Sequence, residues 1–536
     1  MKTFDYVIVG SGAAGCVLAH RLSANPAVTV ALIEAGGSDR HPLIRMPKGL
    51  AKIVIDPSRT WAYPAEPEKG NGFQAEHWAR GRVLGGSTSI DGMLYLRGQP
   101  ADFDEIAAQS SSDWSWEHIG AAYQALESHE LGSAPTRGAR GPLRVTLPDR
   151  RSPLTEAMVQ AGVEMGWPRK LDVNEPDNGE AVGYAPRTIW RGRRQSAAVA
   201  FLEPIRGRPN LTVIVDSLVD KVHFDGRRAT GVATVGSPTQ PAQQYGARRE
   251  VILCGGALAS PGILQRSGIG PGELLRQLGI PVLKDNPQVG QNLRAHRAVI
   301  VQWKLRPPGS DSDNSLFSGW RLIRNVAEYY LTHGGPMSSA SHEIGAWMRS
   351  SPQVPQPDVQ FLATPCSFDF TRQRAFPEPF PGMSIAGYPL RPQSRGEINI
   401  KSSDPNELPQ LRPRYYSADA DRLLMIETVK LARRYAHQPA LRQAIEVETY
   451  PGPDCQTDDR IIEAYDRYGT CGYQAVGSCR MGNDAESVVD PQLRVRGVEA
   501  LRVMDTSIIP QLPAGNTNGP TMAMAWRAAD IITRDT

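Results

Sequence analysis

Three glycines close to the N-terminus have the spacing that binds the phosphates of a dinucleotide. Gly10, Gly12 and Gly15 form a Gly-x-Gly-x-x-Gly motif. The first permits a tight turn, the second lets the backbone approach a pyrophosphate, and the third lets a helix pack closely on a strand. Glu34 follows about 20 residues further on, where a carboxylate accepts the ribose hydroxyls. The pattern predicts a dinucleotide site and argues against NADP, but it does not separate NAD from FAD.

A strand, a helix and a second strand must position these residues. Residues 4–9 are a β-branched apolar run that ends at the first glycine, residues 16–22 have a helical pattern, and residues 28–33 end on the acid. Runs rich in β-branched residues favour strands. A helix that starts at such glycines directs its unpaired N–H groups and its dipole toward the phosphates. We therefore expect a βαβ unit of the Rossmann type at the start of the chain.

Length and composition exclude several classes of protein. With 536 residues the chain is too long for one compact core, so two domains are expected. The net charge of +3 gives no reason to expect a nucleic-acid partner. The six cysteines form no C-x-x-C pair, which favours a reduced, cytoplasmic protein without a structural metal. The sequence shows neither a signal-peptide pattern nor an apolar run of membrane-spanning length, so neither export nor a membrane span is expected.

Two further glycine-rich segments lie downstream. Residues 81–98 begin with Gly-Arg-Val-Leu-Gly-Gly and continue with three hydroxyl residues, which makes a backbone-rich surface suited to a phosphate or a flat ring. Residues 255–270 follow the apolar run 250–253 and contain a glycine turn and a Ser-Pro pair. That order is typical of a strand, a turn and a helix start. The second segment therefore predicts another crossover on the same sheet.

With these motifs the chain resembles the glucose–methanol–choline (GMC) family of oxidoreductases over nearly its whole length. The resemblance includes the three glycine-rich segments, Val-Gly-Gln-Asn-Leu at 289–293 and the C-terminal run 501–520. It implies an α/β fold in which a Rossmann-type FAD-binding domain carries a second, α+β substrate domain of antiparallel sheet and helices. The implied segments are 1–150, 190–300 and 470–536 for the FAD-binding domain and 301–469 for the substrate-binding domain.

The resemblance also implies which residues bind FAD. Some family members attach FAD through a histidine at a position that is Ile90 here, so the FAD is expected to be non-covalent. The next residue, usually an Asn beside the flavin, is Asp91. A buried carboxylate there would have a raised pKa or lower the flavin potential, or it would make the hydrogen bonds of Asn with one proton retained. The expected FAD-binding residues are Gly10, Gly12, Ala13, Ala14, Gly15, Glu34, Ala35, Arg82, Gly85, Gly86, Ser87, Ile90, Asp91, Gly92, Val219, Asp505, Asn516 and Thr517.

The expected catalytic pair lacks its usual histidine. Flavin-dependent alcohol oxidation needs a base for the hydroxyl proton, and this base is usually histidine. The family places it shortly before a Gly-Ser-Cys-x-Met-Gly run and takes a second His or Asn from the C-terminal Asn-x-Asn-x-Pro segment. Here the second partner is Asn518, but the first position is Gln474. An amide cannot hold a proton at ordinary pH, and no histidine follows His437 in the chain.

Three explanations of Gln474 stay open at this point. The chain is an engineered His→Gln variant, the enzyme uses another proton acceptor or another reaction, or the chain is a non-catalytic paralogue. The intact motif around Gln474 favours the first. Two other branches of the family are not favoured. A light-driven fatty-acid decarboxylase branch has a cysteine where this chain has Leu390, and a hydroxynitrile-lyase branch keeps the histidine.

The expected reaction is the oxidation of a primary alcohol, whether aryl, furanic or aliphatic, to the aldehyde, with hydride passing to flavin N5. O₂, a quinone or another acceptor would then reoxidise the flavin. His342 and Glu343 are candidate substrate-site residues that would bind a polar group or act as a substitute base, and Tyr473 is a third. His296 matches a family histidine that is structural rather than catalytic. The alternative is a flavin-binding protein of altered or lost catalysis.

Overall fold

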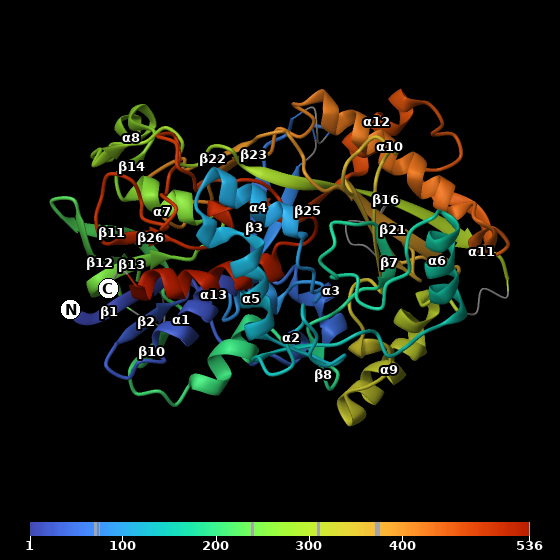
Figure 1. The fold of residues 1–536 in the computed structure, drawn as a ribbon, viewed down its shortest axis with the longest axis horizontal. Helices are drawn as coiled ribbons and strands as arrows, with labels where there is room; N and C mark the ends of the chain where they lie inside the picture. Colours follow the sequence, from blue (N-terminus) through green and yellow to red (C-terminus); the bar gives the residue numbers. More distant parts are fainter. Residues whose placement is uncertain (69–71, 74, 237–240, 308–310, 370–375, 535–536) are drawn as a thin grey trace.

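The chain folds around two large β-sheets, as its computed structural model shows (Figure 1). The structure describes residues 1–536 except 69–71, 74, 237–240, 308–310, 370–375 and 535–536. The first sheet has the order β10-β2-β1-β13-β12-β11, with β26 added beside β13. Its strands are β1 (Lys2–Val9), β2 (Val30–Ile33), β10 (Leu211–Ile214), β11 (Val219–Asp225), β12 (Arg228–Thr234), β13 (Gln244–Leu253) and β26 (Leu501–Val503).

The centre of the first sheet is parallel and buried. β1 runs parallel to β2 and to β13, and β13 runs parallel to β26. All four residues of β2 are buried, which explains why this strand is apolar at every position rather than at alternate ones. The helix α1 (Ala13–Leu22) connects β1 to β2. The predicted βαβ unit is therefore confirmed, with a helix that starts directly after its N-cap Gly12 rather than at residue 16.

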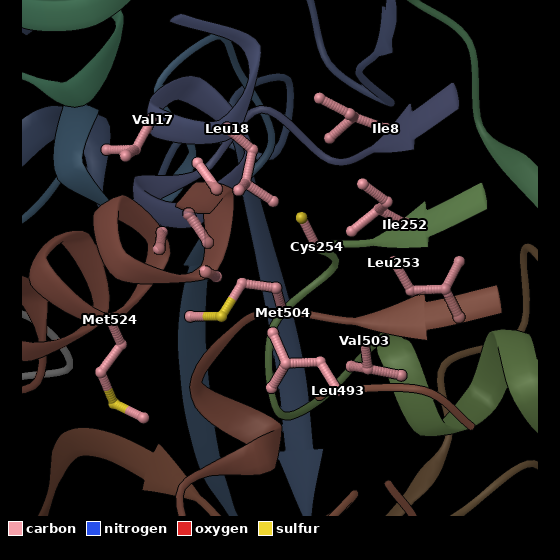
Figure 2. Close-up of a cluster of buried hydrophobic side chains, with 14 of the residues drawn as sticks. Ile8, Val17, Leu18, Ile252, Leu253, Cys254, Leu493, Val503, Met504 and Met524 are labelled. Carbon is pink, nitrogen blue, oxygen red and sulfur yellow. The ribbon is translucent and has the colours of Figure 1, made fainter. Parts of the chain in front are cut away.

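Helices from the two ends of the chain pack together beside the first sheet. α1 lies against α13 (Asn518–Arg534), and Figure 2 shows Val17 and Met524 from these helices in the same buried cluster as the strand residues Ile8 and Ile252. All four side chains are fully buried. This close-packed core holds the C-terminal segment against the N-terminal one, so residues just before α13 reach the predicted dinucleotide site.

The second sheet is antiparallel and is covered by helices of its own. Its order is β24-β16-β21-β18-β17-β7, with β25 beside β16. α10 (Asp419–Ala436) packs on β16 and β21, and α6 (Pro153–Glu164) packs on β7 and β17, at the right of Figure 1. The strands are β7 (Ala181–Tyr184), β16 (Arg294–Leu305), β17 (Ile344–Met348), β18 (Val359–Thr364), β21 (Gly382–Pro389), β24 (Ile445–Tyr450) and β25 (Thr470–Val476).

Shorter elements complete the fold. The other helices are α2 (Pro42–Arg45), α3 (Leu50–Ile53), α4 (Pro100–Gln109), α5 (Trp116–Leu126), α7 (Ser260–Arg266), α8 (Gly272–Gln277), α9 (Gly319–Thr332), α11 (Pro439–Arg442) and α12 (Asp458–Tyr468). Small sheets are formed by β3 (Thr60–Ala65), β4 (Glu76–Gly81), β22 (Glu397–Asn399) and β23 (Gln410–Arg412), by β5 (Glu127–His129) and β6 (Leu143–Val145), by β8 (Ile189–Trp190) and β9 (Arg193–Arg194), by β14 (Ile269–Gly270) and β15 (Lys284–Asp285), and by β19 (Phe368–Asp369) and β20 (Phe376–Pro377).

The predicted fold class is confirmed: a Rossmann-type parallel sheet is joined to an antiparallel sheet with helices. The first sheet takes its strands from three separate stretches of the chain, within residues 2–33, 211–253 and 501–503. β7 belongs to the second sheet although it lies in a stretch that the sequence left unassigned. The segment boundaries expected from the sequence stay a prediction.

The six cysteines are all buried and none is in a disulfide. Across the described residues, no group of three His, Cys, Asp or Glu side chains is arranged to hold a metal ion. Within the same part of the chain, no helix combines the length and the apolar composition needed to cross a membrane.

Candidate active site

A single large cavity collects most of the residues that the sequence singled out. Its volume is about 670 Å³, within the range of cofactor and ligand pockets. It extends from the glycine turns of the first sheet to the inner face of the second. The predicted site residues that line it are Gly10, Gly12, Ala13, Ala14, Glu34, Ala35, Gly86, Ser87, Ile90, Asp91, Gly92, Val219, His342, Tyr473, Gln474, Asp505, Asn516, Thr517 and Asn518.

Two glycine-rich segments meet at the dinucleotide end of the cavity. Gly86 has a φ of +54°, and a Cβ added to it would lie 2.7 Å from the Cα of Gly12. A Cβ added to Gly12 meets nothing within 4 Å, so this position faces open space. Gly12 is also the N-cap of α1 and provides no side chain to cap it. The first N–H groups of α1 therefore remain available for an anion, which suits a pyrophosphate.

Gly15 allows the close packing of α1 on the glycine turn. A Cβ at Gly15 would lie 1.9 Å from the carbonyl oxygen of Gly10, so only glycine allows α1 to approach the end of β1 this closely. Gly85 has a φ of +88°, and its Cβ would meet the Ser89 hydroxyl at 2.3 Å. Neither residue lines the cavity, so both support the site rather than contact its contents.

Glu34, which the sequence predicts to bind the ribose, lines the cavity directly after β2. Its Oε2 accepts hydrogen bonds from the Ser11 amide at 3.0 Å and the Ser11 hydroxyl at 2.8 Å, and its Oε1 accepts one from the Gly36 amide at 2.9 Å. Burial raises the pKa of Glu34, and these hydrogen bonds oppose the rise. Arg82 does not line the cavity, because its guanidinium lies over the Trp61 ring at 4.4 Å from the centroid.

Asp505 ties the C-terminal segment to the third glycine-rich turn. Its Oδ2 accepts hydrogen bonds from the Gly256 amide at 2.8 Å and the Ser260 hydroxyl at 2.5 Å, and its Oδ1 accepts one from the Ser507 amide at 2.8 Å. Burial raises the pKa of this carboxyl against the effect of its donors. Three donors on one buried carboxylate hold both segments at the cavity wall.

Asp91 accepts hydrogen bonds from three protein donors. Its Oδ1 accepts hydrogen bonds from Arg194 Nη1 at 2.7 Å and from the Met93 amide at 3.0 Å, and its Oδ2 accepts one from Asn518 Nδ2 at 3.2 Å. The side chain of Arg194 is only 1% exposed and that of Asp91 is 27% exposed, so the cation is buried while the carboxylate borders the cavity. Burial raises the pKa of Asp91, while the Arg194 charge opposes the rise. The pKa of Asp91 is therefore raised, as one of the alternatives from the sequence expected. The sequence did not predict the buried Arg194 that pairs with this carboxylate.

Gln474 lies on β25 and is held by the loop before α13. Its Oε1 accepts hydrogen bonds from the backbone N–H and from the hydroxyl of Thr517, each at 2.8 Å. Its Nε2 donates to the Gly472 carbonyl at 3.1 Å, which leaves the second N–H of the amide unused. Gln474 can therefore donate a hydrogen bond to a ligand oxygen, but it cannot accept a proton.

Asn516 and Asn518 approach the cavity differently. Asn516 Oδ1 accepts a hydrogen bond from the Tyr388 hydroxyl at 3.2 Å, so its amide N–H groups are directed elsewhere. Tyr388 is itself stacked on His296 at a centroid distance of 4.6 Å. Asn518, the residue assigned to the catalytic pair from the sequence, donates to Asp91. Both asparagines line the cavity, and Asn516 is the one whose amide is free of a carboxylate partner.

His342 lines the cavity beside Asp91 and Gly92. The neighbouring Ser341 donates its amide and its hydroxyl to the Gly92 carbonyl, each at 3.2 Å. The Ser341 oxygen is also 3.0 Å from His342 Nδ1. In the arrangement in which the Ser341 hydroxyl donates to Gly92, Nδ1 carries the proton of the imidazole and Nε2 is the unprotonated nitrogen. Burial lowers the pKa of His342 to about 4, with Lys48 adding to the effect, so the ring is neutral at ordinary pH.

Glu343 and Tyr473, the other two candidate substrate residues, form no hydrogen bond with His342 or Gln474 among the described residues. Glu343 is buried but does not line the cavity, and its backbone pairs with Ala363 and Ala185. Tyr473 lines the cavity and is 48% exposed.

Two residues that contact site residues were not predicted from the sequence, Arg194 and Tyr388. Arg194 lies in a basic run, Arg191 to Arg194, whose composition is typical of a solvated loop. Its burial depends on contacts with the Ile44, Thr88 and Asp91 carbonyls, which no local pattern reveals. Tyr388 lies on an apolar strand and resembles an ordinary core aromatic.

The fold and the site together define an FAD-dependent oxidoreductase. Two family models described as GMC oxidoreductase match residues 4–298 and 392–525. The chain belongs to the GMC oxidoreductase family. Its cavity fits FAD, since Gly12 and Gly86 leave room for a pyrophosphate and the N-terminus of α1 faces it. Ile90, a buried hydrocarbon side chain in the cavity wall, has no atom that forms the covalent link.

Similar proteins support this assignment. The chain is 38% identical to the oxygen-dependent choline dehydrogenase of Ectopseudomonas mendocina, over 99% of this chain and 94% of the relative. The pyridoxine 4-oxidase of Mesorbium loti has a similar structure, with a TM-score of 0.88, 31% identity and coverage of 98% of each chain. An Aspergillus oryzae formate oxidase has a TM-score of 0.92 and 25% identity, over 100% of this chain and 98% of that chain.

Proposed function

We propose that this protein oxidises a small primary alcohol to the aldehyde and that His342 accepts the hydroxyl proton. The observation that carries the proposal is the position of His342, which lines the same cavity as Gln474, contacts Ser341 through Nδ1 and has no partner at Nε2 among the described residues. Bound FAD supplies the acceptor for the hydride. The chain thus contains a proton acceptor in the cavity although Gln474 replaces the usual histidine.

The other polar groups orient the alcohol. The free N–H of Gln474 and the amide of Asn516 are hydrogen-bond donors for the substrate oxygen. Donors at this oxygen fix the position of the carbon that loses the hydride, which lowers the entropic part of the barrier. Asp91 is less suited to accept the proton, because Arg194, Met93 and Asn518 already occupy its oxygens.

The substrate end of the cavity is largely apolar. Strands β16, β18 and β21 contribute Ala298, Ile300, Leu362 and Ala386 to its wall. Such a wall favours an alcohol with an aryl, furanic or aliphatic body, since apolar surface is buried there without loss of hydrogen bonds. Choline is the second candidate substrate, favoured by the choline dehydrogenases at 38% identity. O₂ or a quinone reoxidises the flavin.

Anaerobic mixing of the FAD-loaded protein with benzyl alcohol, 5-hydroxymethylfurfural, 1-butanol and choline tests the proposal. Bleaching of the flavin absorbance by one of these alcohols is the expected result. If none reduces the flavin in this chain or in a Gln474→His variant, the protein binds FAD without oxidising alcohols. The matched variant His342→Asn keeps a donor near the Nδ1 position but lacks the acceptor nitrogen, so slow reduction there identifies the base.

A further inference from the structure

The helix α9 has two apolar faces, and only one of them is covered. On the inner face, Leu322, Val326 and Tyr329 pack against Met46 and Met337. This contact holds the helix on the protein, near the segment that precedes His342. An amphipathic helix of a globular protein normally presents charged and polar residues on its opposite face. The outer face of α9 departs from that pattern.

Large apolar side chains project from the outer face of α9 into solvent. Trp320 is 65% exposed, Ile323 is 73% exposed, Tyr330 is 50% exposed and Leu331 is 85% exposed. Their spacing places them on one side of the helix. Figure 1 shows α9 at the lower edge of the molecule, where it projects from the rest of the fold. Single exposed apolar residues are ordinary, but a contiguous group of this size marks an interaction surface.

Arginines border this apolar stripe. Arg321 and Arg324 lie on the same helix and donate hydrogen bonds to Ser315 and Asn325, and neither forms an ion pair within the described part of the chain. Arg324 lies over the ring of Trp320, 5.1 Å from its centroid. The charges at this edge of α9 are therefore available to an external anion.

The hairpin of β8 and β9 extends the surface at the other end of α9. Arg193 Nη2 is 2.7 Å from the Nε2 of His333, the residue that ends the helix. The hairpin also contributes Arg191 and Trp190, which is 38% exposed. We name this region the α9 surface; it consists of Trp190, Arg191, Arg193, Trp320, Arg321, Ile323, Arg324, Tyr330 and Leu331.

We propose that the α9 surface docks on an anionic lipid bilayer, with α9 lying in the plane of the interface. Helices that bind in this way combine an apolar face with flanking Lys or Arg and carry Trp or Tyr at the level of the headgroups. The unpaired arginines would meet lipid phosphates, and the apolar side chains would enter the boundary with the acyl chains. A second copy of the chain fits less well, since a two-fold contact would bring the same arginines face to face.

Sedimentation of the full-length, FAD-loaded protein with lipid vesicles tests this proposal. One set of vesicles contains phosphatidylcholine alone, and the other also contains phosphatidylglycerol. We expect the protein to sediment with the anionic vesicles, to bind the neutral ones about tenfold more weakly, and to dissociate as salt screens the arginines.

Variants on the α9 surface separate the apolar and charged contributions. The triple change Trp320→Ser, Ile323→Ser and Leu331→Ser should weaken binding at least about tenfold, because each side chain loses its apolar burial. Arg321→Gln with Arg324→Gln should remove most of the preference for anionic lipid. A matched control replaces Leu171 and Leu423, which are 63% and 65% exposed outside the α9 surface, with Ser. The control should bind like the wild type, and every variant should keep its FAD content.

Three results would overturn the proposal. The protein fails to bind either kind of vesicle, or the triple variant binds as well as the control. The third is a dimer seen by light scattering that the triple variant converts to a monomer while vesicle binding is absent. That result would assign the α9 surface to a second copy of the chain.

Discussion

Thr517 donates both its backbone N–H and its hydroxyl to the Oε1 of Gln474, at 2.8 Å each. The two residues come from β25 and from the loop before α13, so this contact joins the two segments that carry the expected catalytic pair. It also fixes which end of the amide faces the cavity. The side-chain carbonyl of Gln474 accepts hydrogen bonds from Thr517, so only an N–H of its amide remains for a substrate.

Introducing a histidine at position 474 should accelerate flavin reduction. The Gln474→His variant places a titratable ring where Gln474 now offers only a donor, and general-base catalysis contributes ~10²–10⁴ in rate. Because His342 already accepts a proton in our proposal, we expect a gain near the lower limit. Stopped-flow absorbance under anaerobic conditions measures it with the best alcohol of the panel. A Gln474→Asn variant, which adds no base, is the control, and an equal rate in both variants would contradict the prediction.

Replacing His342 should remove the proton acceptor without disturbing the fold. His342→Asn should lower the rate of flavin reduction by ~10²–10⁴, the usual contribution of a general base. Burial lowers the pKa of His342 to about 4, so the wild-type ring is neutral above that pH and becomes protonated below it. The rate of the wild type should therefore be level across neutral pH and fall only as the pH approaches 4.

The pH profile and the variant together identify the role. A wild-type rate that instead falls near the ordinary pKa of histidine would show that His342 is not buried as the structure has it. If the rate of the His342→Asn variant is unchanged, the hydroxyl proton passes to another group or to water, and His342 is not the base.

The ion pair between Arg194 and Asp91 should matter for stability. Arg194→Met leaves the Asp91 carboxylate without its buried counter-ion, which should lower the free energy of unfolding by about 3–5 kcal/mol. Because Arg194 opposes the rise of the Asp91 pKa, its loss raises that pKa further. A raised carboxyl pKa costs stability as the pH increases, so the variant should lose more stability above neutrality than at acidic pH.

Urea denaturation at several pH values measures this effect. The double variant Asp91→Asn with Arg194→Met removes both charges and should recover part of the loss. If the double variant is no more stable than Arg194→Met, the pair contributes through shape rather than charge.

Two glycines of the first motif should separate FAD binding from folding. Gly12→Ala adds a Cβ that meets no protein atom within 4 Å, so the protein should fold normally but bind FAD at least about tenfold more weakly. Gly15→Ala places a Cβ 1.9 Å from the Gly10 carbonyl, which forces α1 away from β1 and should impair folding itself. Thermal denaturation and flavin fluorescence titration of the apoprotein distinguish the two. Equal behaviour of the two variants would contradict the prediction.

The sequence by itself determined the fold class, the cofactor and most of the dinucleotide end of the site. Gly10, Gly12 and Gly15 can be recognised from the sequence, because their function depends on their own backbone conformation and on the absence of a side chain. The sequence also shows Gln474 at the position where the family resemblance implies a histidine, because the surrounding motif marks that position. An unbroken apolar run such as β2 predicts a buried parallel strand for the same reason.

Only the tertiary structure decided which side chains meet in the cavity. Arg194 is paired with Asp91, and Thr517 with Gln474, across separations of 103 and 43 residues. His342 contacts Ser341 through Nδ1, and Ser341 is held by the carbonyl of Gly92, which is 249 residues away. Burial, tautomer and charge pairing depend on neighbours distant in the chain, and no local spacing encodes them. The sequence therefore predicted an FAD site without the usual base and offered His342 and Glu343 as substitutes, and the fold placed only His342 of these two in the cavity wall.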